Sequence, residues 1–216
     1  MSKQELSREA RPTGRRGEGP AVRRIDALRV ITELGADLPV VATCAATSRE
    51  LAAVEDRPNH LYLLDSMGLT TSVGTGLALA CEGSAVPHVI TIDGDGSLLM
   101  NLGALATAGY LAPERMLVVL LDNGVYASTG NIPTQAGRID LGAVAAACGL
   151  HVEATDSADG LRTHLAAMLD APGPHLLHVR IEPGNEPGTP LLLDDPVVLG
   201  HRFEAWLTTR MEGAVR

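Results

Sequence analysis

Apolar residues occur along this chain in two repeating patterns, one typical of helices and the other of short strands. In residues 25–34 they recur every three or four positions, which predicts a helix with Gly35 as its C-cap. The next apolar run, 38–43, is short and continuous, as expected for a buried strand. The ordered part of the chain therefore begins with a helix followed by a strand.

The same alternation continues along the rest of the chain, with Gly and Pro between the elements. Further strands are expected at 60–66, 88–94, 114–123, 151–155 and 174–183. Further helices are expected at 48–55 with Ser48 as N-cap, and at 70–83, 97–111, 139–150, 159–170 and 197–207. Strands that alternate with helices form right-handed βαβ units. The fold class that we predict is therefore α/β, a doubly wound, mainly parallel sheet with helices on both faces.

Length and composition set the domain organisation. Residues 1–22 lack apolar periodicity and are rich in Arg, Gly and Glu, so we expect them to form a disordered tail. Residues 23–216 have a length that suits one hydrophobic core, and we expect them to form a single domain. The three cysteines are scattered along the chain, which argues against a disulfide framework.

The charge balance and the hydropathy narrow the classes of partner. The formal net charge is −9, which argues against a nucleic-acid-binding protein. No apolar run approaches the roughly 20 residues that a membrane span requires, and the N-terminus carries no apolar leader segment. We therefore expect a cytoplasmic protein with no nucleic-acid partner and no membrane partner.

Polar residues follow two of the predicted strands at the point where each strand ends. Asp95 lies between Gly94 and Gly96 after one strand, and Asn123 follows the next strand. Because parallel strands place their carboxyl ends at one edge of the sheet, both side chains are expected at that edge, where ligands bind. The helix that we expect to begin at Ser97 would attract an anion. A carboxylate beside a bound anion requires a cation between them, and oxygen ligands favour Mg²⁺ bridging phosphates.

The spacing of these two segments resembles the cofactor motif of thiamine-diphosphate enzymes, in which a GDG sequence precedes an Asn by about this length. The resemblance implies that Asp95, the side-chain oxygen of Asn123 and the backbone carbonyl of Val125 bind Mg²⁺. It also implies that Gly96 and Ser97 contact the diphosphate of the cofactor. The resemblance adds three further cofactor-binding residues: Thr43, Gly94 and Tyr126.

The upstream sequence DSMG resembles the segment of this family that holds the aminopyrimidine ring. Met67 lies where the family has a bulky apolar side chain that supports the bent cofactor. The carbonyl of Asp65 would accept a hydrogen bond from the 4′-amino group, and Ser66 completes the expected cofactor-binding segment. Asp65 replaces the glycine that is usual at its position, which leaves the role of the backbone carbonyl intact.

Four segments narrow the resemblance to the sulfopyruvate and phosphonopyruvate decarboxylases. They are 40–51, 65–68, 94–105 and 122–134. The chain departs from that pattern at Cys44 and Ala45, where these enzymes tend to have a glycine, and at Ile132, where they tend to have Gln. The departure at Ile132 lies in a loop expected over the reacting centre, so it bears on substrate identity more than on cofactor binding.

Three polar residues of the same loop are candidates for substrate contacts. Ser128, Thr129 and Asn131 either hydrogen-bond an anionic substrate or shape a turn, and both interpretations stay open.

The resemblance implies a reaction and a partner. We expect the diphosphate-binding β subunit of a decarboxylase that converts 3-phosphonopyruvate or 3-sulfopyruvate, both small anionic 2-oxo acids, to an aldehyde and CO₂. Such enzymes require a Glu from a pyrimidine-binding domain, and no Glu of this chain matches that motif, so we assign no catalytic residue here. A separate α chain is expected to supply this Glu, in a hetero-oligomer that holds thiamine diphosphate and Mg²⁺. Two alternatives stay open: a half-subunit of a carboligase resembling acetolactate synthase or transketolase, and a non-catalytic cofactor-binding module.

Overall fold

The described part of the chain begins one residue earlier than the sequence suggested. The computed structural model describes residues 22–212, so the expected tail lies outside the described residues except for Val22. Val22 is buried and forms an isolated parallel bridge with Ile181. Its carbonyl also accepts a hydrogen bond from the backbone N–H of Glu182 at 2.8 Å. Val22 therefore packs with the folded domain.

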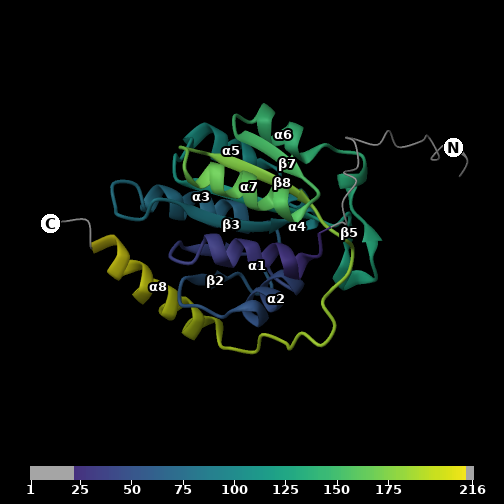
Figure 1. The fold of residues 1–216 in the computed structure, drawn as a ribbon, viewed down its shortest axis with the longest axis horizontal. Coiled ribbons are helices and arrows are strands. Elements are labelled where there is room, and N and C mark those ends of the chain that lie inside the picture. The colour runs from purple at the N-terminus through teal and green to yellow at the C-terminus, as the bar shows by residue number, and fades with distance from the viewer. Residues whose placement is uncertain (1–21, 213–216) are drawn as a thin grey trace, which may run out of the picture.

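Six parallel strands form one sheet, in the order β2-β1-β3-β4-β8-β7 (Figure 1). The strands are β1 (Val40–Ala42), β2 (His60–Tyr62), β3 (Val89–Gly94), β4 (Met116–Asp122), β7 (His151–Thr155) and β8 (His175–Arg180). Neighbouring strands pair in parallel throughout this sheet. The predicted fold class, a doubly wound and mainly parallel α/β sheet, is confirmed.

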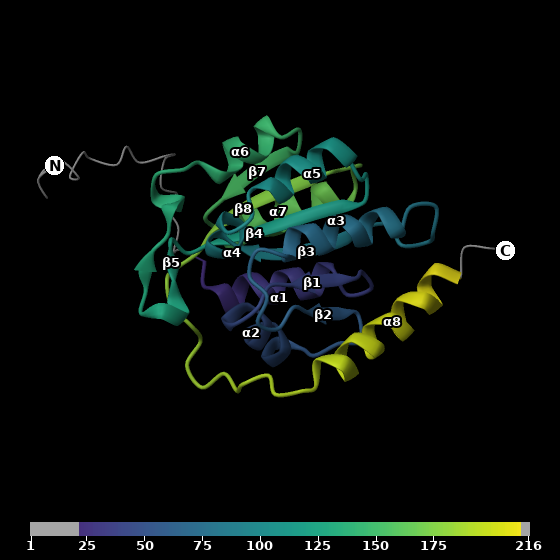
Figure 2. The same cartoon turned by 180° about the vertical axis from the view of Figure 1, so that it is seen from behind.

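Helices cover both faces of the sheet, so its central strands are buried on both sides (Figures 1 and 2). On β4, Leu117 and Val119 pack into one core, whereas Val118 and Leu120 pack into the other. The first core is covered by α1 (Arg24–Leu34), α2 (Ala46–Val54) and α7 (Ala158–Leu169). The second is covered by α3 (Thr70–Ala80), α5 (Gly103–Leu111) and α6 (Leu141–Ala147). Continuous apolar strands therefore reflect two-sided burial, which is typical of parallel sheets.

The strand order reverses between β1 and β3. The chain moves from β1 outward to β2, and then returns across β1 to build the other half of the sheet from β3. Consequently, α2 after β1 packs on one face, whereas α4 (Asp95–Leu99) after β3 packs on the opposite face. The loops that follow these two strands diverge, which leaves space at the carboxyl edge for a ligand.

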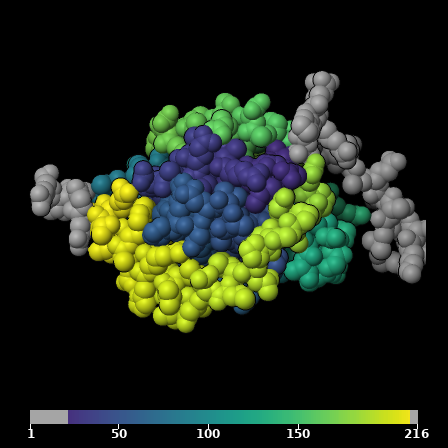
Figure 3. Space-filling model, turned by 60° about the horizontal axis from the view of Figure 1, so that its bottom comes forward, coloured from purple at the N-terminus to yellow at the C-terminus, as the bar shows by residue number. Residues whose placement is uncertain are grey.

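A long connection and a terminal helix close the other side of the molecule. Residues 184–195 run from β8 along the face that carries α1 and α2 (Figure 3). The last helix, α8 (Pro196–Glu212), packs against the edge strand β2 and buries Leu199 in the core. None of the helices within residues 22–212 has the length and apolar character needed to cross a membrane.

Two predicted helix starts are wrong. Ser48 is not the N-cap of α2, because that helix begins at Ala46, and the Ser48 hydroxyl instead donates to the carbonyl of Thr43 at 2.6 Å. The helix expected at 97–111 begins at Asp95 and is divided into α4 and α5. Asn101 lies in the break between them and donates its side-chain amide to the carbonyl of Gly68 at 3.0 Å, which ties the break to the preceding loop.

The segment 124–138, expected as a loop, contains a small antiparallel hairpin. Its strands are β5 (Val125–Tyr126) and β6 (Ile132–Pro133). They are joined by a single turn of 3₁₀-helix at Ala127–Thr129. Two-residue strands carry too little apolar periodicity to be recognised in a sequence. The hairpin projects from the carboxyl edge of the sheet (Figure 1).

Candidate functional site

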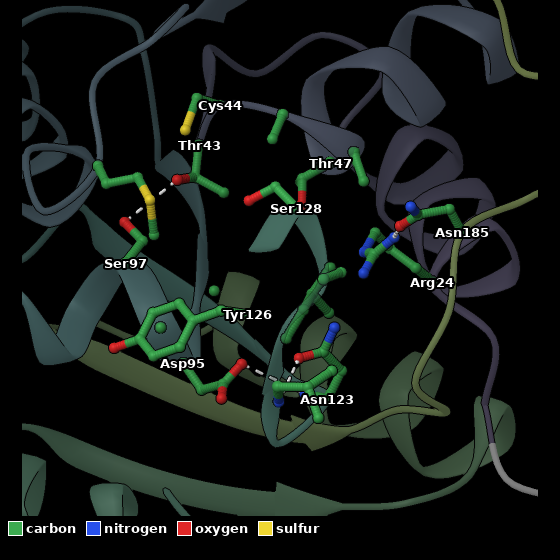
Figure 4. A pocket seen from close by; sticks show the side chains of 18 of the residues that line it. Arg24, Thr43, Cys44, Thr47, Asp95, Ser97, Asn123, Tyr126, Ser128 and Asn185 are labelled. Atoms are coloured by element: carbon green, nitrogen blue, oxygen red, sulfur yellow. Dashed lines mark hydrogen bonds between the residues drawn. The ribbon is translucent and has the colours of Figure 1, made fainter. Parts of the chain in front are cut away.

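A cleft opens at the carboxyl edge of the sheet, where the loops after β1, β3 and β4 meet (Figure 4). The predicted residues that line it are Thr43, Met67, Gly94, Asp95, Gly96, Ser97, Asn123, Val125, Tyr126 and Ser128. The predicted residues outside its lining are Asp65, Ser66, Thr129 and Asn131. The cleft therefore lies at the reversal of strand order, and it brings together residues that are far apart in the sequence.

Asp95 is the only carboxylate among the cleft-lining residues of the described chain. The residue is only 2% exposed. Its carboxylate accepts a hydrogen bond from the hydroxyl of Thr134 at 2.6 Å and one from the backbone N–H of Asn123 at 3.3 Å. Within residues 22–212, no Lys, Arg or His forms an ion pair with it. Burial raises the pKa of the Asp95 carboxyl above its usual range, while the Thr134 hydrogen bond opposes that change.

The turn after β4 holds Asn123 beside Asp95. The side-chain oxygen of Asn123 accepts from the backbone N–H of Val125 at 3.0 Å. The preceding Asp122 accepts from the backbone N–H of Gly124 at 3.0 Å, and its other oxygen lies 2.8 Å from Nε2 of the buried His178. These bonds fix the conformation of the turn and hold the carboxamide of Asn123 at the cleft.

This set of donors fits a hard divalent cation such as Mg²⁺. A buried carboxylate without a charged partner, a carboxamide oxygen and nearby backbone carbonyls are the oxygen ligands that Mg²⁺ prefers. Imidazole and sulfur ligands would favour zinc or copper, but no histidine is among the described lining residues, and Cys44 lies on the side of the cleft away from Asp95 and Asn123 (Figure 4). Across the described residues, no three His, Cys, Asp or Glu side chains converge in a way that could hold a metal. A bound Mg²⁺ would use Asp95, Asn123 and the carbonyl of Val125.

Ser97 follows β3 and connects the segments after β1 and β2 to the wall of the cleft. Its hydroxyl oxygen accepts from the backbone N–H of Gly68 at 3.0 Å and from the hydroxyl of Thr43 at 3.2 Å. Met67, next to Gly68, is 37% exposed and lines the cleft. Through these bonds Ser97 fixes the position of the segment that carries Met67.

Gly96 permits a close contact with the ring of Tyr126. A Cβ atom built at Gly96 would lie 2.5 Å from the Cε1 atom of that ring, closer than carbon atoms approach in proteins. The absence of a side chain therefore lets the β5 segment fold down over the start of α4. This contact accounts for the second glycine of the GDG sequence in physical terms.

Two residues that replace family glycines have backbone conformations that favour glycine. Ala45 has φ 62° and ψ −128°, a region that non-glycine residues rarely adopt. Asp65 has φ 57°, in the left-handed region. Asp tolerates this region better than Ala does, because its short polar side chain can hydrogen-bond locally. The backbone therefore keeps a glycine-like geometry at both positions although the side chain differs.

Several lining residues were not found from the sequence. Arg24, Thr47, Arg49 and Asn185 line the cleft, and Thr134 orients Asp95 from the end of the hairpin. Arg24 and Asn185 come from opposite ends of the domain, so no local motif joins them. Arg49 and Thr47 lie inside the ATSREL segment, at the start of α2. Their place in the first turn of a helix that follows a strand was the one feature of the sequence that could have indicated a position at the carboxyl edge of the sheet.

Comparison with known proteins decides the family. Residues 42–179 match the family described as "Thiamine pyrophosphate enzyme, C-terminal TPP binding domain". The chain belongs to this family of thiamine pyrophosphate (TPP) enzymes. The matched residues include every lining residue of the cleft except Arg24 and Asn185. The predicted resemblance to thiamine-diphosphate enzymes is confirmed.

The curated relatives of this TPP-binding domain include two kinds of decarboxylase. The chain is 43% identical over 211 residues to phosphonopyruvate decarboxylase of Streptomyces viridochromogenes, covering 97% of this chain and 51% of that protein. It is 45% identical over 162 residues to sulfopyruvate decarboxylase subunit beta of Methanothermobacter thermautotrophicus, covering 75% of this chain and 83% of that subunit. The chain thus spans about half the length of the first relative and most of the second.

Solved structures support the fold of the TPP-binding domain. Benzoylformate decarboxylase of Polynucleobacter necessarius superposes with a TM-score of 0.65 at 21% sequence identity. The superposition covers 81% of this chain and 36% of that structure. At this identity the likeness concerns the arrangement of strands and helices alone.

Proposed function

We propose that this chain binds Mg²⁺–thiamine diphosphate and is the diphosphate-binding subunit of a 2-oxo acid decarboxylase. The observation that carries the proposal is the buried carboxylate of Asp95, which has no cationic partner among the described residues and lies beside Asn123 at the reversal of strand order. Membership of the TPP-binding family supports the cofactor. The donor set supports the magnesium ion.

Five of the lining residues hold the cofactor directly in this proposal. Asp95, the side-chain oxygen of Asn123 and the carbonyl of Val125 hold Mg²⁺, which neutralises the diphosphate beside the carboxylate. Gly96 allows the backbone to approach the diphosphate. Met67 lines the cleft with a partly exposed side chain and supports the bent cofactor.

The remaining predicted residues take supporting roles. Thr43 and Ser97 fix the wall of the cleft through their mutual hydrogen bond. Tyr126 packs over the start of α4, and Gly94 ends β3. Asp65 and Ser66 lie outside the lining of the cleft, and their proposed role is to hold the segment that carries Met67.

The reaction that we propose is decarboxylation of 3-phosphonopyruvate or 3-sulfopyruvate. Both activities appear in the names of relatives that are more than 40% identical to this chain. Bound thiamine diphosphate supplies a nucleophilic carbon and accepts the electrons released when CO₂ leaves. The residues of this chain bind and orient the cofactor, and the cleft walls limit the access of water to it.

The pyrimidine-binding domain is proposed to come from a separate chain. One relative is named a beta subunit, and this chain covers 83% of it. We propose a hetero-oligomer in which an α chain supplies the activating Glu and the cofactor lies between the two subunits. The exposed side chain of Met67 is consistent with a site completed from outside the chain.

Product analysis tests the proposed function. The chain is purified with the candidate α chain and supplied with thiamine diphosphate, Mg²⁺ and 3-phosphonopyruvate, 3-sulfopyruvate or pyruvate. Release of CO₂ with a free aldehyde is expected for one of the first two. A product with a new C–C bond when an aldehyde is added would instead identify a carboligase. Absence of any reaction by a complex that binds the cofactor would leave the non-catalytic module as the better interpretation.

A further inference from the structure

Two arginines line the cleft, and they differ in their partners. Nη1 of Arg24 donates to Glu50 at 2.8 Å and to the side-chain oxygen of Asn185 at 3.1 Å, and the ion pair with Glu50 is buried. Arg49, in the first turns of α2, forms no ion pair or side-chain hydrogen bond with any residue in the described part of the chain. The charge of Arg24 is therefore compensated, whereas that of Arg49 is not.

Two hydroxyl groups in the same cleft also lack partners. Thr47 is only 6% exposed, yet its hydroxyl forms no hydrogen bond with the described residues. Ser128, at the hairpin, lines the cleft and likewise has no hydrogen-bond partner in residues 22–212. Figure 4 shows Thr47 and Ser128 on the side of the cleft away from Asp95 and Asn123. Ser128 is an exposed residue, and the Thr47 hydroxyl is not among the fully buried unpaired atoms, so a ligand that accepts hydrogen bonds can replace water at both groups.

The chemistry of these groups selects the kind of ligand. A guanidinium group is always charged, and its planar set of N–H donors matches the oxygens of phosphate-like groups. Threonine and serine hydroxyls can each donate one further bond to such an oxygen. Asp95 is the only carboxylate that lines the cleft in the described chain, and it is assigned to the metal. No acidic lining residue therefore competes for Arg49.

We propose that Arg49, with the hydroxyls of Thr47 and Ser128, binds a tetrahedral oxyanion: a phosphonate, sulfonate or phosphate group. The proposal rests on the proposed function for the origin of that group, which has two possible sources. One is the anionic group at C3 of 3-phosphonopyruvate or 3-sulfopyruvate. The other is the terminal phosphate of thiamine diphosphate. The same guanidinium chemistry serves either source.

Arg24 is a poorer candidate, and it is not a suitable position for the test. Glu50 accepts both from Arg24 and from the backbone N–H of Glu186 at 3.1 Å, so the pair joins α1, α2 and the connection after β8. Removing one member of a buried ion pair leaves an uncompensated charge and destabilises the fold. Arg24 therefore holds the wall of the cleft, while Arg49 is available to a ligand.

The experiment compares Arg49→Gln, Arg49→Lys and a control, Arg162→Gln, each in the complex with the α chain. Arg162 is an exposed arginine of α7 that pairs with Glu33 at 2.7 Å outside the cleft. Calorimetry gives the Kd for thiamine diphosphate in the presence of Mg²⁺. Steady-state kinetics gives KM for the anionic 2-oxo acid and for pyruvate, which lacks the second anionic group.

Two results support the oxyanion subsite, and they distinguish its source. If it holds the substrate, Arg49→Gln raises KM for the anionic 2-oxo acid by roughly 10- to 100-fold, the loss expected for a charge-assisted hydrogen bond, with KM for pyruvate and the Kd unchanged. If it holds the cofactor, the Kd rises by a similar factor and the ratio of the two KM values stays constant. In either case Arg49→Lys retains part of the effect, since it keeps the charge but loses the planar donors.

One result overturns the proposal. It is that the Kd for thiamine diphosphate and the ratio of KM for the anionic 2-oxo acid to KM for pyruvate both stay, in Arg49→Gln, within about twofold of the Arg162→Gln values. Failure of the proposed function looks different, because the unmodified complex would then turn over no 2-oxo acid. In that case binding of inorganic phosphate and of inorganic pyrophosphate to the unmodified complex and to Arg49→Gln, again by calorimetry, still tests the subsite for both sources. Equal affinities of the two proteins would exclude it.

Discussion

Replacing Ala45 with glycine tests whether the turn that enters α2 is strained. With φ 62° and ψ −128°, Ala45 occupies a backbone region that is almost restricted to glycine, and such a residue costs about 1–3 kcal/mol. Glycine loses more chain entropy on folding, which offsets about 0.5–1 kcal/mol of the gain. The expected net result of Ala45→Gly is therefore an increase of roughly 1 kcal/mol in the free energy of unfolding.

Urea unfolding followed by circular dichroism measures this change, together with the thermal midpoint. A gain of 1 kcal/mol raises Tm by about 2–4 °C for a chain of this size. Ala53→Gly is the matched control, because Ala53 is exposed on the same helix with ordinary helical geometry, and glycine should cost about 1 kcal/mol there. If Ala45→Gly destabilises the protein as much as Ala53→Gly does, the strain assigned to this turn does not exist.

Four further changes have defined outcomes. Asp95→Asn should abolish the Mg²⁺-dependent rise of Tm caused by thiamine diphosphate, whereas Asp159→Asn, at an exposed position of α7, should preserve it. An unchanged rise in Asp95→Asn would remove this residue from the metal site. Met67→Ala should lower kcat by about tenfold or more through lost orientation while the cofactor Kd stays within about threefold, and a Kd effect alone would argue against the supporting role. Gly96→Ala should destabilise the fold by about 1–3 kcal/mol through contact with the Tyr126 ring, and adding Tyr126→Ala should recover most of that loss; no recovery would place the cause elsewhere. Burial lowers the pKa of His60 to about 4, so the folded state favours the neutral imidazole. The contribution of this group to the free energy of unfolding is complete above pH 6.5, and roughly 3 kcal/mol of it is lost as the pH falls toward 4. His60→Gln should flatten this part of the curve of unfolding free energy against pH.

The sheet and its carboxyl edge could be predicted because their signals are local. Each buried strand is a continuous apolar run, and a parallel sheet places Asp95 and Asn123 at the same edge whatever the details of packing. The helix starts were harder to predict. Ser48 looks like an N-cap by residue type, but the chain turns at Ala45 in a glycine-like conformation, and no pattern in the sequence indicates that a non-glycine residue adopts it.

The remaining cleft residues depend on tertiary contacts that a sequence does not display. Thr134 reaches Asp95 across 39 positions because the hairpin of β5 and β6 folds back, and those strands are too short to show a period. Arg24 donates a hydrogen bond to Asn185 across 161 positions, and it also forms a buried ion pair with Glu50 of another helix. From the sequence alone, Arg24 and Glu50 would be predicted to be exposed, because isolated Arg and Glu side chains are seldom buried.

Calorimetric titration of thiamine diphosphate into the complex of this chain with its α chain tests the central claim most directly. The claim is that the carboxyl edge of this sheet holds the diphosphate end of the cofactor through a divalent cation. The predicted result is saturable binding with Mg²⁺ that disappears in EDTA and in Asp95→Ala, with the circular dichroism spectrum of the variant unchanged. Equally tight binding in EDTA, or by Asp95→Ala, would contradict it.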